Sequence, residues 1–388
     1  MEYNFDELID RKKSNCVKHD GLDKWYGRSD LLPMWVADMD FRTPDFVMEA
    51  IRKRCEHEVL GYAIAGDSYY EAVHDWLKSH YHIVASHEEL HFIPGIVAGI
   101  AFALQAFTAP GDKILLLNPV YPPFINLPQV EARQLSCSHL RVEKGRFAID
   151  FEDFEQKAKG CKMMILSNPH NPGGTIWSVD DLRTIATICH RHNIFVVADE
   201  IHADLTLPGY HHTSYATVSE EAKFHSITFM APSKTFNIAG LGSSIAYLPN
   251  PILRKRLFHY LDGYEIANGN IFAFVGAEAA FRHGEEWLRQ LKNYLAGNVA
   301  LLQSHLRHFL PQVDPILPEA SFLPWLDFSH FGWNHEELSS RFINNAKIAL
   351  NDGTTFGGDN YRCCFRLNIG CPRATLQEAL NRITKALQ

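Results

Sequence analysis

The sequence lacks a segment long and apolar enough to cross a membrane. Its most apolar stretch, residues 93–107, is shorter than the roughly 20 residues that a spanning helix needs, and Pro94 and Gln105 interrupt it. The N-terminus also lacks the positive start and apolar core of a secretory signal, because four acids lie among its first ten residues. We therefore expect a cytoplasmic protein without a membrane partner.

An excess of positive charge is also missing. The 388 residues carry a formal net charge of −8, and 46% of them are hydrophobic while 21% are charged. Nucleic acids and anionic membrane surfaces bind clustered Lys and Arg, which this composition does not favour. Small molecules are the expected ligands of a chain with this composition.

The patterns of common disulfide and metal sites are absent as well. Eight cysteines occur without a C-x-x-C pair, so reduced thiols are expected, and the 21 histidines include no H-E-x-x-H. The densest group, Cys189, His190 and His192, ends a predicted helix, where cations are favourable without a metal. We expect no metal site.

What the sequence does contain is an alternation of strand and helix signals, which indicates an α/β fold with a doubly wound, mainly parallel sheet. The helices expected around it include 44–58, 98–107 and 179–192. Ligands bind such sheets at the carboxyl ends of the strands. The predicted strands are Lys113 to Leu117, Arg133 to His139, Met163 to Leu166, Ile194 to Ala198, Ser226 to Phe229 and Ser244 to Leu248.

After residue 268 the pattern becomes helical and then changes to a smaller α+β unit. There we expect strands at 322–328 and 363–368 and a helix at 335–347. The predicted division is an N-terminal arm with part of a small domain at 1–45, a large ligand-binding domain at 46–284, and a C-terminal small domain at 285–388.

Lys234 lies in an otherwise apolar and small-residue run, SITFMAPSKTFNIAGLGSSIAY. It could be a loop lysine whose stem is covered while its charged head reaches water. Alternatively, burial lowers its pKa so that the free amine can attack a carbonyl and form a Schiff base. A lysine that carried a pyridine aldehyde in this way would need an acid for the ring nitrogen, a phosphate site and a cation for the substrate carboxylate.

Asp199 and Arg366 are candidates for the acid and the cation. Asp199 follows the apolar strand residues FVVA, where a carboxylate needs a positive partner, although it could instead cap the next helix. Arg366 lies in the apolar segment CCFRLNIGCP and could bind a carboxylate with both arms of its guanidinium or form an internal ion pair.

Three further features could hold the rest of such a cofactor. Asn171 in the turn SNPHNPGGT could donate to a phenolate oxygen, although turn chemistry alone accounts for most of that turn. The backbone amides of Ile96 and Val97 precede a helix and suit a phosphate. Tyr121 follows a strand and could stack on a ring, or it could be a core aromatic residue.

Taken together, the chain resembles pyridoxal 5′-phosphate enzymes of the aspartate-aminotransferase type (fold type I, aminotransferase class I/II), and more narrowly the MalY/PatB-type carbon–sulfur lyases. The resemblance runs nearly from end to end, and its most specific motifs come in the family's order. They are MWVADMDF (34–41), GYAIAGDSYYEAVHDWL (61–77), PGIVAGI (94–100), NPVYPPF (118–124), SNPHNPGGTIWS (167–178), VADEIHADL (197–205), SKTFNIAGL (233–241) and FRLNIGCPR (365–373).

The resemblance implies roles for individual residues. Lys234 would form the Schiff base and move protons, Asp199 would pair with the pyridinium, and Arg366 would bind the substrate carboxylate. Cofactor contacts are implied for Ile96, Val97, Tyr121, Asn171, His202 and Ser233, and for Tyr62 from the other subunit of a homodimer. Substrate contacts are implied for Asn171, Tyr121, Trp35 and Ala37.

The chain departs from the wider aminotransferase pattern around the phosphate. Gly242 stands where many aminotransferases have a phosphate-binding arginine, and Ala231 stands where a serine is common. His202 replaces a tyrosine that often meets the ring oxygen, and here the chain resembles the narrower lyase family. The phosphate would then depend on Ser233, the helix N-terminus and Tyr62.

The expected function is β-elimination from S-substituted L-cysteines, with cystathionine as the leading substrate and a thiol, pyruvate and ammonia as products. An aminotransferase is the alternative among enzymes, because both reactions pass through the same carbanion. Regulation through protein binding is an alternative of another class, although no partner surface is marked in the sequence.

Overall fold

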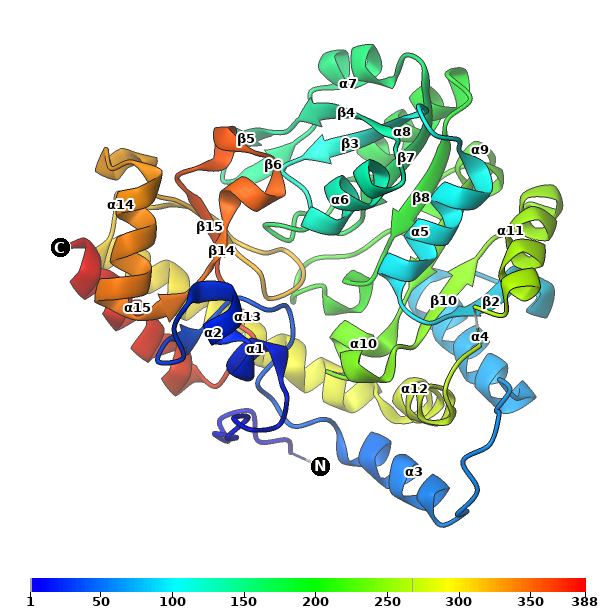
Figure 1. Ribbon diagram of the computed structural model, residues 1–388, viewed down its shortest axis with the longest axis horizontal. Coiled ribbons are helices and arrows are strands. Elements are labelled where there is room, and N and C mark those ends of the chain that lie inside the picture. The colour runs from blue at the N-terminus through cyan, green and yellow to red at the C-terminus, as the bar shows by residue number, and fades with distance from the viewer. Residues whose placement is uncertain (1, 267) are drawn as a thin grey trace.

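The structure, a computed structural model, describes residues 2–266 and 268–388. A seven-stranded sheet of order β2-β10-β9-β8-β7-β3-β4 forms its larger lobe, at the upper right of Figure 1. Strands β4, β3, β7, β8 and β9 are parallel, whereas β10 is antiparallel to both its neighbours. The expected α/β class with a mainly parallel sheet is confirmed. The strands are β2 (Leu90–Ile93), β3 (Lys113–Asn118), β4 (Gln134–His139), β7 (Cys161–Ser167), β8 (Phe195–Asp199), β9 (Ser226–Met230) and β10 (Ser244–Tyr247).

Helices cover both faces of this sheet, because the side chains along each strand alternate between two cores. On β3, Ile114 and Leu116 point into the core beneath α5 and α11, while Leu115 and Leu117 point into the core beneath α7 and α8. Burial on both sides explains why the inner strands β3, β7 and β8 are largely apolar runs. The helices of this lobe are α3 (Asp45–Cys55), α4 (Asp67–Tyr81), α5 (Ile96–Phe107), α6 (Pro122–Val130), α7 (Phe151–Ala158), α8 (Val179–Arg191), α9 (Glu220–Phe224), α10 (Pro232–Thr235), α11 (Pro251–Tyr264) and α12 (Ile271–His283).

The C-terminal part builds a second, smaller sheet of order β11-β12-β15-β14, on the left of Figure 1. The 25-residue helix α13 (Glu285–Phe309) runs from the larger lobe toward it. The other elements are β11 (Asp314–Ile316), β12 (Trp325–Asp327), α14 (His335–Ser340), the π-helical turn η6 (Arg341–Ala346), β13 (Ile348–Ala349), β14 (Asn351–Asp352), β15 (Cys364–Arg366) and α15 (Arg373–Leu387). Two short strands, β5 (Arg141–Glu143) and β6 (Arg146–Ala148), form a separate hairpin.

The N-terminal segment packs with the C-terminal lobe. Strand β1 (Leu32–Pro33) pairs in parallel with β13, with Leu32 opposite Ile348. The short helices α1 (Val17–Asp20) and α2 (Leu22–Tyr26) precede it and lie beside the smaller lobe in Figure 1. The proposed domain boundary near residue 285 coincides with the start of α13 and stays a prediction.

The residues that follow β3, β7, β8 and β9 meet at one edge of the large sheet, because these four strands run in the same direction. This edge faces the N-terminal segment and the smaller lobe (Figure 1). None of the helices in residues 2–266 and 268–388 is both long and apolar enough to cross a bilayer. The same residues contain no group of three potential metal ligands.

Candidate active site

Lys234 lies on α10, a single helical turn that follows β9 after Ala231. Its Nζ donates a hydrogen bond of 2.5 Å to the carbonyl oxygen of Ala37, and it contributes to the wall of a cavity of about 650 Å³. Burial lowers the pKa of Lys234 to about 8, against the opposing attraction of Asp38 and Asp199. The amine can therefore lose its proton near neutral pH, as a Schiff-base lysine must.

Asp199 ends β8, the strand next to β9, and is buried. Its Oδ1 accepts a hydrogen bond of 3.0 Å from the backbone N–H of Ile201. Burial raises the pKa of Asp199 to about 7, although Ile201 and Lys234 lower it. No cation among the described residues forms an ion pair with this carboxylate, so it is suited to receive a cation from a ligand.

Arg366 ends β15 and is only 3% exposed. Its Nη1 donates to Oδ1 of Asn171 at 2.9 Å. Its Nη2 donates to Oδ1 of Asn351 at 2.6 Å and to the carbonyl of Trp35 at 3.3 Å. The guanidinium lies 4.9 Å from the ring centre of Phe356. Nε has no partner, and within the described chain no carboxylate pairs with the group. A buried, uncompensated guanidinium is a binding site for an anion.

Asn171 and Tyr121 lie beside this guanidinium. Asn171 follows β7, and its side-chain oxygen accepts a hydrogen bond from Arg366. The NH₂ group of the same side chain therefore points away from the guanidinium. Burial raises the pKa of the Tyr121 phenol, which also feels the charges of Arg366 and Asp199. Tyr121 therefore lies within electrostatic range of both the guanidinium of Arg366 and the carboxylate of Asp199.

His202 is buried in the same cluster. Burial, together with the positive charges of Lys234 and Arg366, lowers the pKa of His202 to about 3. The imidazole is therefore neutral, and its Nδ1 has no hydrogen-bond partner. A buried, unpartnered nitrogen here is available to a polar ligand group.

The region expected to hold a phosphate is built around the start of α5. Gly95 precedes this helix with φ of 136°, and a Cβ at Gly95 would meet no atom within 4 Å, so the helix N-terminus borders open space. Ile96 is buried, Val97 is 39% exposed, and Ser233 is buried beside Lys234. The start of α5 therefore leaves room for a ligand, and a phosphate site formed by Ile96, Val97 and Ser233 stays a prediction.

Gly242, the departure from the aminotransferase pattern, has a backbone reason. It ends the 3₁₀ turn η4 (Ala239–Leu241) in the left-handed conformation, with φ of 61°. A Cβ there would also lie 3.3 Å from the carbonyl oxygen of Pro94. An arginine at this position would be strained, so this backbone does not provide the usual phosphate ligand.

Trp35 and Ala37 contribute backbone rather than side-chain groups. The carbonyl of Trp35 accepts from Arg366, whereas its indole packs against Tyr26 at 5.2 Å between ring centres and donates to the carbonyl of Lys18. Ala37 offers its carbonyl to Lys234. The structure therefore brings the segment 34–41 to the site through its main chain.

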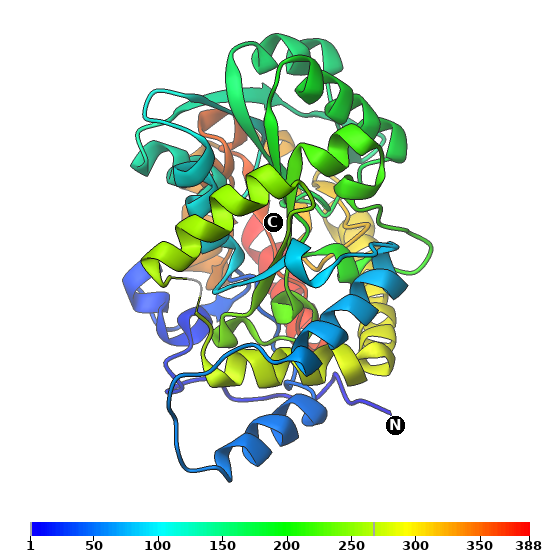
Figure 2. The ribbon, with the colours of Figure 1, turned by 90° about the vertical axis from the view of Figure 1, so that its right-hand side faces the viewer.

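Tyr62 is the one predicted site residue that lies elsewhere in the described chain. Its side chain is fully exposed. The segment between α3 and α4 that carries it lies at the periphery of the molecule in Figures 1 and 2. It borders a different cavity, of about 980 Å³, which does not include Lys234. Within this chain Tyr62 therefore takes no part in the cluster around Lys234.

Several residues that the sequence did not single out support the site. Asn351 and Phe356 hold Arg366, and Asn368 donates to backbone carbonyls of the segment 34–41. Asn368 lies two residues beyond Arg366, and the period of two along a strand could have indicated it. Asn351 and Phe356 reach Arg366 only through tertiary packing, so no local pattern could have found them.

The residues present fit pyridoxal 5′-phosphate. Lys234 is an amine of lowered pKa for the aldehyde, Asp199 is an unpaired acid for the ring nitrogen, and the start of α5 borders open space for the phosphate. Arg366 then remains for the carboxylate of an amino acid. The unpartnered atoms of Arg366 and His202 are consistent with a site built to receive a polar ligand.

Comparison with known proteins gives the same result along the whole chain. Residues 30–383 match the family model of aminotransferase class I and II. The chain is 39% identical to the cystathionine beta-lyase PatB of Bacillus subtilis over 99% of this chain and 100% of the relative. It superposes on cystalysin from Treponema denticola, which contains pyridoxal 5′-phosphate, with a TM-score of 0.96 and 30% identity, covering 100% of this chain and 99% of the other. For the pyridoxal-phosphate-bound C–S lyase from Staphylococcus hominis the TM-score is 0.92 and the identity 34%, covering 100% and 98%.

Proposed function

Because this chain belongs to the aminotransferase class I and II family, we propose that it is a pyridoxal-phosphate-dependent carbon–sulfur β-lyase. Its substrates are L-cystathionine or other S-substituted L-cysteines, which it converts with water to a thiol, pyruvate and ammonia. The observation that carries this proposal is the full-length similarity to a cystathionine beta-lyase, together with the buried Lys234 and Asp199 with their shifted pKa values.

The cofactor is held by residues from several strand ends. Lys234 binds its aldehyde, Asp199 faces its ring nitrogen, and the amides of Ile96 and Val97 with Ser233 bind its phosphate. Further contacts to the ring come from Tyr121, Asn171 and His202. When bound, pyridoxal 5′-phosphate supplies a sink for the electron pair left at Cα of the substrate.

The chain's own groups orient the substrate and move its proton. The guanidinium of Arg366 binds the substrate carboxylate, and its contacts with Asn171 and Asn351 fix its plane. Lys234 Nζ, with a pKa of about 8, takes the proton from Cα when it is in the free amine form. Asp199 stays ionised once a cation lies against it, because the attraction of the cation offsets the effect of burial on its pKa.

The proposal is tested by incubating the purified protein with L-cystathionine in the absence of a keto acid. We expect equal amounts of pyruvate, ammonia and thiol, and at least about a thousandfold loss of rate in Lys234→Ala. The exposed Lys255→Ala on α11 is the matched control and should keep the parent rate. If no product forms until a keto acid is added and an amino group is then transferred, the protein is an aminotransferase instead.

We also propose that the protein is a homodimer with shared active sites. The support is that Tyr62, which the family resemblance assigns to the cofactor phosphate, is fully exposed and far in the fold from the cluster around Lys234. Apolar neighbours of Tyr62 are exposed as well, including Leu60 at 65% and Ile64 at 88%. A second subunit would cover these side chains and receive Tyr62.

Subunit complementation tests the shared site. Lys234→Ala and Tyr62→Ala subunits are co-expressed with different tags and the mixed dimer is purified. If Tyr62 acts on the other subunit, one of the two sites in the mixed dimer is intact and about half of the parent activity per dimer returns. No gain over the two single variants would mean that Tyr62 acts within its own subunit or not at all.

A cytoplasmic location is likewise a proposal. Its support is that all eight cysteines are free thiols, although several are exposed or only half-buried. Fractionation of the source cells, followed by immunoblotting, should find the protein with cytoplasmic markers.

A further inference from the structure

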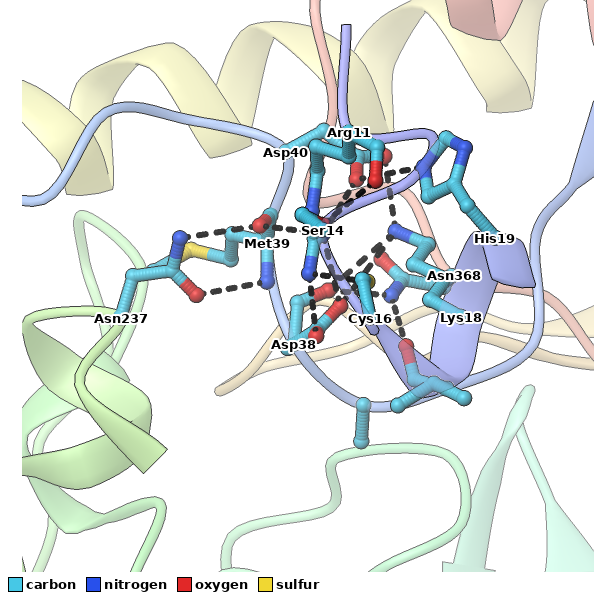
Figure 3. Close-up of polar contacts among 12 residues, drawn as sticks. Arg11, Ser14, Cys16, Lys18, His19, Asp38, Met39, Asp40, Asn237 and Asn368 are labelled. Atoms are coloured by element: carbon cyan, nitrogen blue, oxygen red, sulfur yellow. Dashed lines mark hydrogen bonds and ion pairs between the residues drawn. The ribbon is translucent and has the colours of Figure 1, made fainter. Parts of the chain in front are cut away.

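Segment 34–41 passes between Lys234 and the strand that carries Arg366, and its backbone is fixed residue by residue. Asn368 Nδ2 donates to the carbonyls of Val36 and Asp38, and Lys234 Nζ donates to the carbonyl of Ala37. The side chain of Asn237 accepts from the N–H of Met39 and donates to its carbonyl, as Figure 3 shows. The segment therefore connects the reactive lysine with the substrate-binding strand.

The carboxylate of Asp38 is held from the outside by two cations of the N-terminal segment. Arg11 donates to both oxygens of Asp38, at 3.1 and 2.7 Å, and Lys18 Nζ lies 3.8 Å from Oδ1 (Figure 3). Lys18 also donates to the carbonyl oxygen of Asp38 at 3.3 Å. The two arms of the guanidinium fix the orientation of the carboxylate, and Lys18 fixes the backbone next to Ala37.

Asp40 completes the cluster and keeps its cations paired. Burial opposes ionisation of Asp40, but Lys18, His19 and Arg11 together hold its pKa well below the usual range. Lys18 is fully buried, and its Nζ lies 2.7 Å from Asp40. Lys18 and Arg11 would therefore each keep a carboxylate partner in Asp40 if the charge of Asp38 were removed.

The charged groups that act on Lys234 come from three elements. Asp38 on the segment 34–41 and Asp199 at the end of β8 favour its protonated form, whereas Arg366 on β15 disfavours it. His202, which also lies close, is neutral. Asp38 exerts the largest attraction of these groups, yet it makes no hydrogen bond to Lys234 and binds neither substrate nor cofactor in the function proposed above.

We propose that Asp38 is a positioning residue for that function: clamped by Arg11 and Lys18, it fixes the carbonyl of Ala37 against Lys234 and supplies a fixed negative charge beside the amine. The role of Asp38 as a positioning residue rests on the proposed function. Its contacts and its charge, however, are present without the cofactor, so their effect on Lys234 can be measured in the cofactor-free protein.

The test is competitive labelling of the cofactor-free protein with trace acetic anhydride across pH 6 to 11, with acetylation of Lys234 followed by mass spectrometry. In Asp38→Asn we expect the titration midpoint of Lys234 to fall by about half a unit or more, because a charge is lost while the shape is kept. Asp40→Asn is the matched control. It removes a partner of the same two cations but should move the midpoint by less than about 0.2 unit.

If Asp38 had only a structural role, Asp38→Asn and Asp40→Asn would have the same effect on the titration midpoint of Lys234. Equal midpoints for Asp38→Asn and the parent protein, or equal shifts in Asp38→Asn and Asp40→Asn, would overturn the proposal. Glu7→Gln breaks the exposed ion pair between the N-terminal segment and Arg42, the residue that follows the segment 34–41, and should leave the midpoint unchanged.

A second variant covers the case in which Asp38→Asn does not fold. Arg11→Gln removes the cation that offsets Asp38, so the midpoint of Lys234 should rise by about half a unit. A fall or no change there would contradict the proposal.

Failure of the proposed function is recognised separately. If the parent protein neither binds pyridoxal 5′-phosphate nor cleaves cystathionine, the enzyme assignment fails, whereas the labelling midpoints still decide the role of Asp38. In protein reconstituted with the cofactor, the pH midpoint of its yellow absorbance should shift in the same direction as the labelling midpoint in Asp38→Asn.

Discussion

At the scale of single residues, the site holds ionisable groups in states that they do not prefer in water. Burial lowers the pKa of Lys234 to about 8 and raises the pKa of Asp199 to about 7. Arg366 is buried without a carboxylate partner in the described residues, and its pKa falls to about 10 for the same reason. Such groups destabilise the cofactor-free protein and are retained because ligands complete their pairing.

Lys234→Met should therefore stabilise the cofactor-free protein. Between pH 8 and 10.5 the unfolded chain binds the lysine proton and the folded chain does not, so this lysine makes stability rise with pH in that window. At pH 7 the variant should be more stable by about 1–2 kcal/mol, and the difference should shrink toward pH 10. Urea unfolding at pH 7, 9 and 10 measures this, with Lys255→Met as the surface control.

Arg366→Lys should weaken substrate binding although it keeps the positive charge. A lysine cannot replace a guanidinium that is fixed by Asn171 and Asn351 and that presents two donors to a carboxylate. We expect KM for cystathionine to rise about 30-fold or more, which corresponds to about 2 kcal/mol, with a smaller change in kcat. Arg362→Lys, on an exposed side chain close in sequence, should keep the parent kinetics. Similar effects of both variants would remove Arg366 from the substrate site.

At the scale of elements, the helix that carries Lys234 is too short to be stable alone. Its position depends on Asp204, which accepts from Thr235 Oγ1 at 2.8 Å, from Trp76 Nε1 at 3.0 Å and from the hydroxyl of Tyr81. A buried carboxylate with three donors thus fixes the turn next to the reactive lysine.

Thr235→Val should lower stability by about 1–3 kcal/mol, because it leaves one oxygen of Asp204 without that donor while it preserves the shape of the side chain. Activity should fall as well, since the turn that carries Lys234 loses an anchor. Thr187→Val on α8, where the hydroxyl bonds only to an exposed carbonyl of its own helix, is the control and should change stability by less than about 0.5 kcal/mol. Denaturant unfolding and steady-state kinetics measure both variants.

The elements differ in how well local sequence predicts them. The six expected strands of the large sheet are all present, with ends shifted by one or two residues, because long apolar runs between helices have few alternatives. Strand β2 was not predicted, because its four residues are too few to show a clear hydrophobic period. It is recognised as a strand only through its antiparallel pairing with β10. The expected strand 322–328 is reduced to Trp325–Asp327, and the expected helix 335–347 ends in a π-helical turn.

At the scale of the whole molecule, the chain has an exposed apolar surface. Val59, Leu60, Tyr62 and Ile64 are each at least 65% exposed on one short segment between α3 and α4. The same segment borders the 980 Å³ cavity together with Phe92 and Phe274. Exposed apolar side chains next to a cavity are typical of a surface that another chain covers.

Ile64→Asp should therefore weaken subunit association, because burying a carboxylate without a partner costs several kcal/mol. We expect light scattering to show a shift from dimer to monomer at micromolar concentration, with loss of cofactor binding. Val142→Asp, on an exposed valine of β5, should leave the mass unchanged. An unchanged mass in Ile64→Asp would show that this segment is not part of the interface.

The sequence alone determined the alternation of strands and helices, the position of Lys234 after a strand, and the family resemblance, because these depend on local patterns and motif order. Only the tertiary structure decided that Arg366 has no acidic partner among the described residues, that Asp38 is clamped beside Lys234, and that Tyr62 lies apart from them. The physical reason is that the charge environment of a buried group is set by neighbours distant in sequence, and no periodicity along the chain records them.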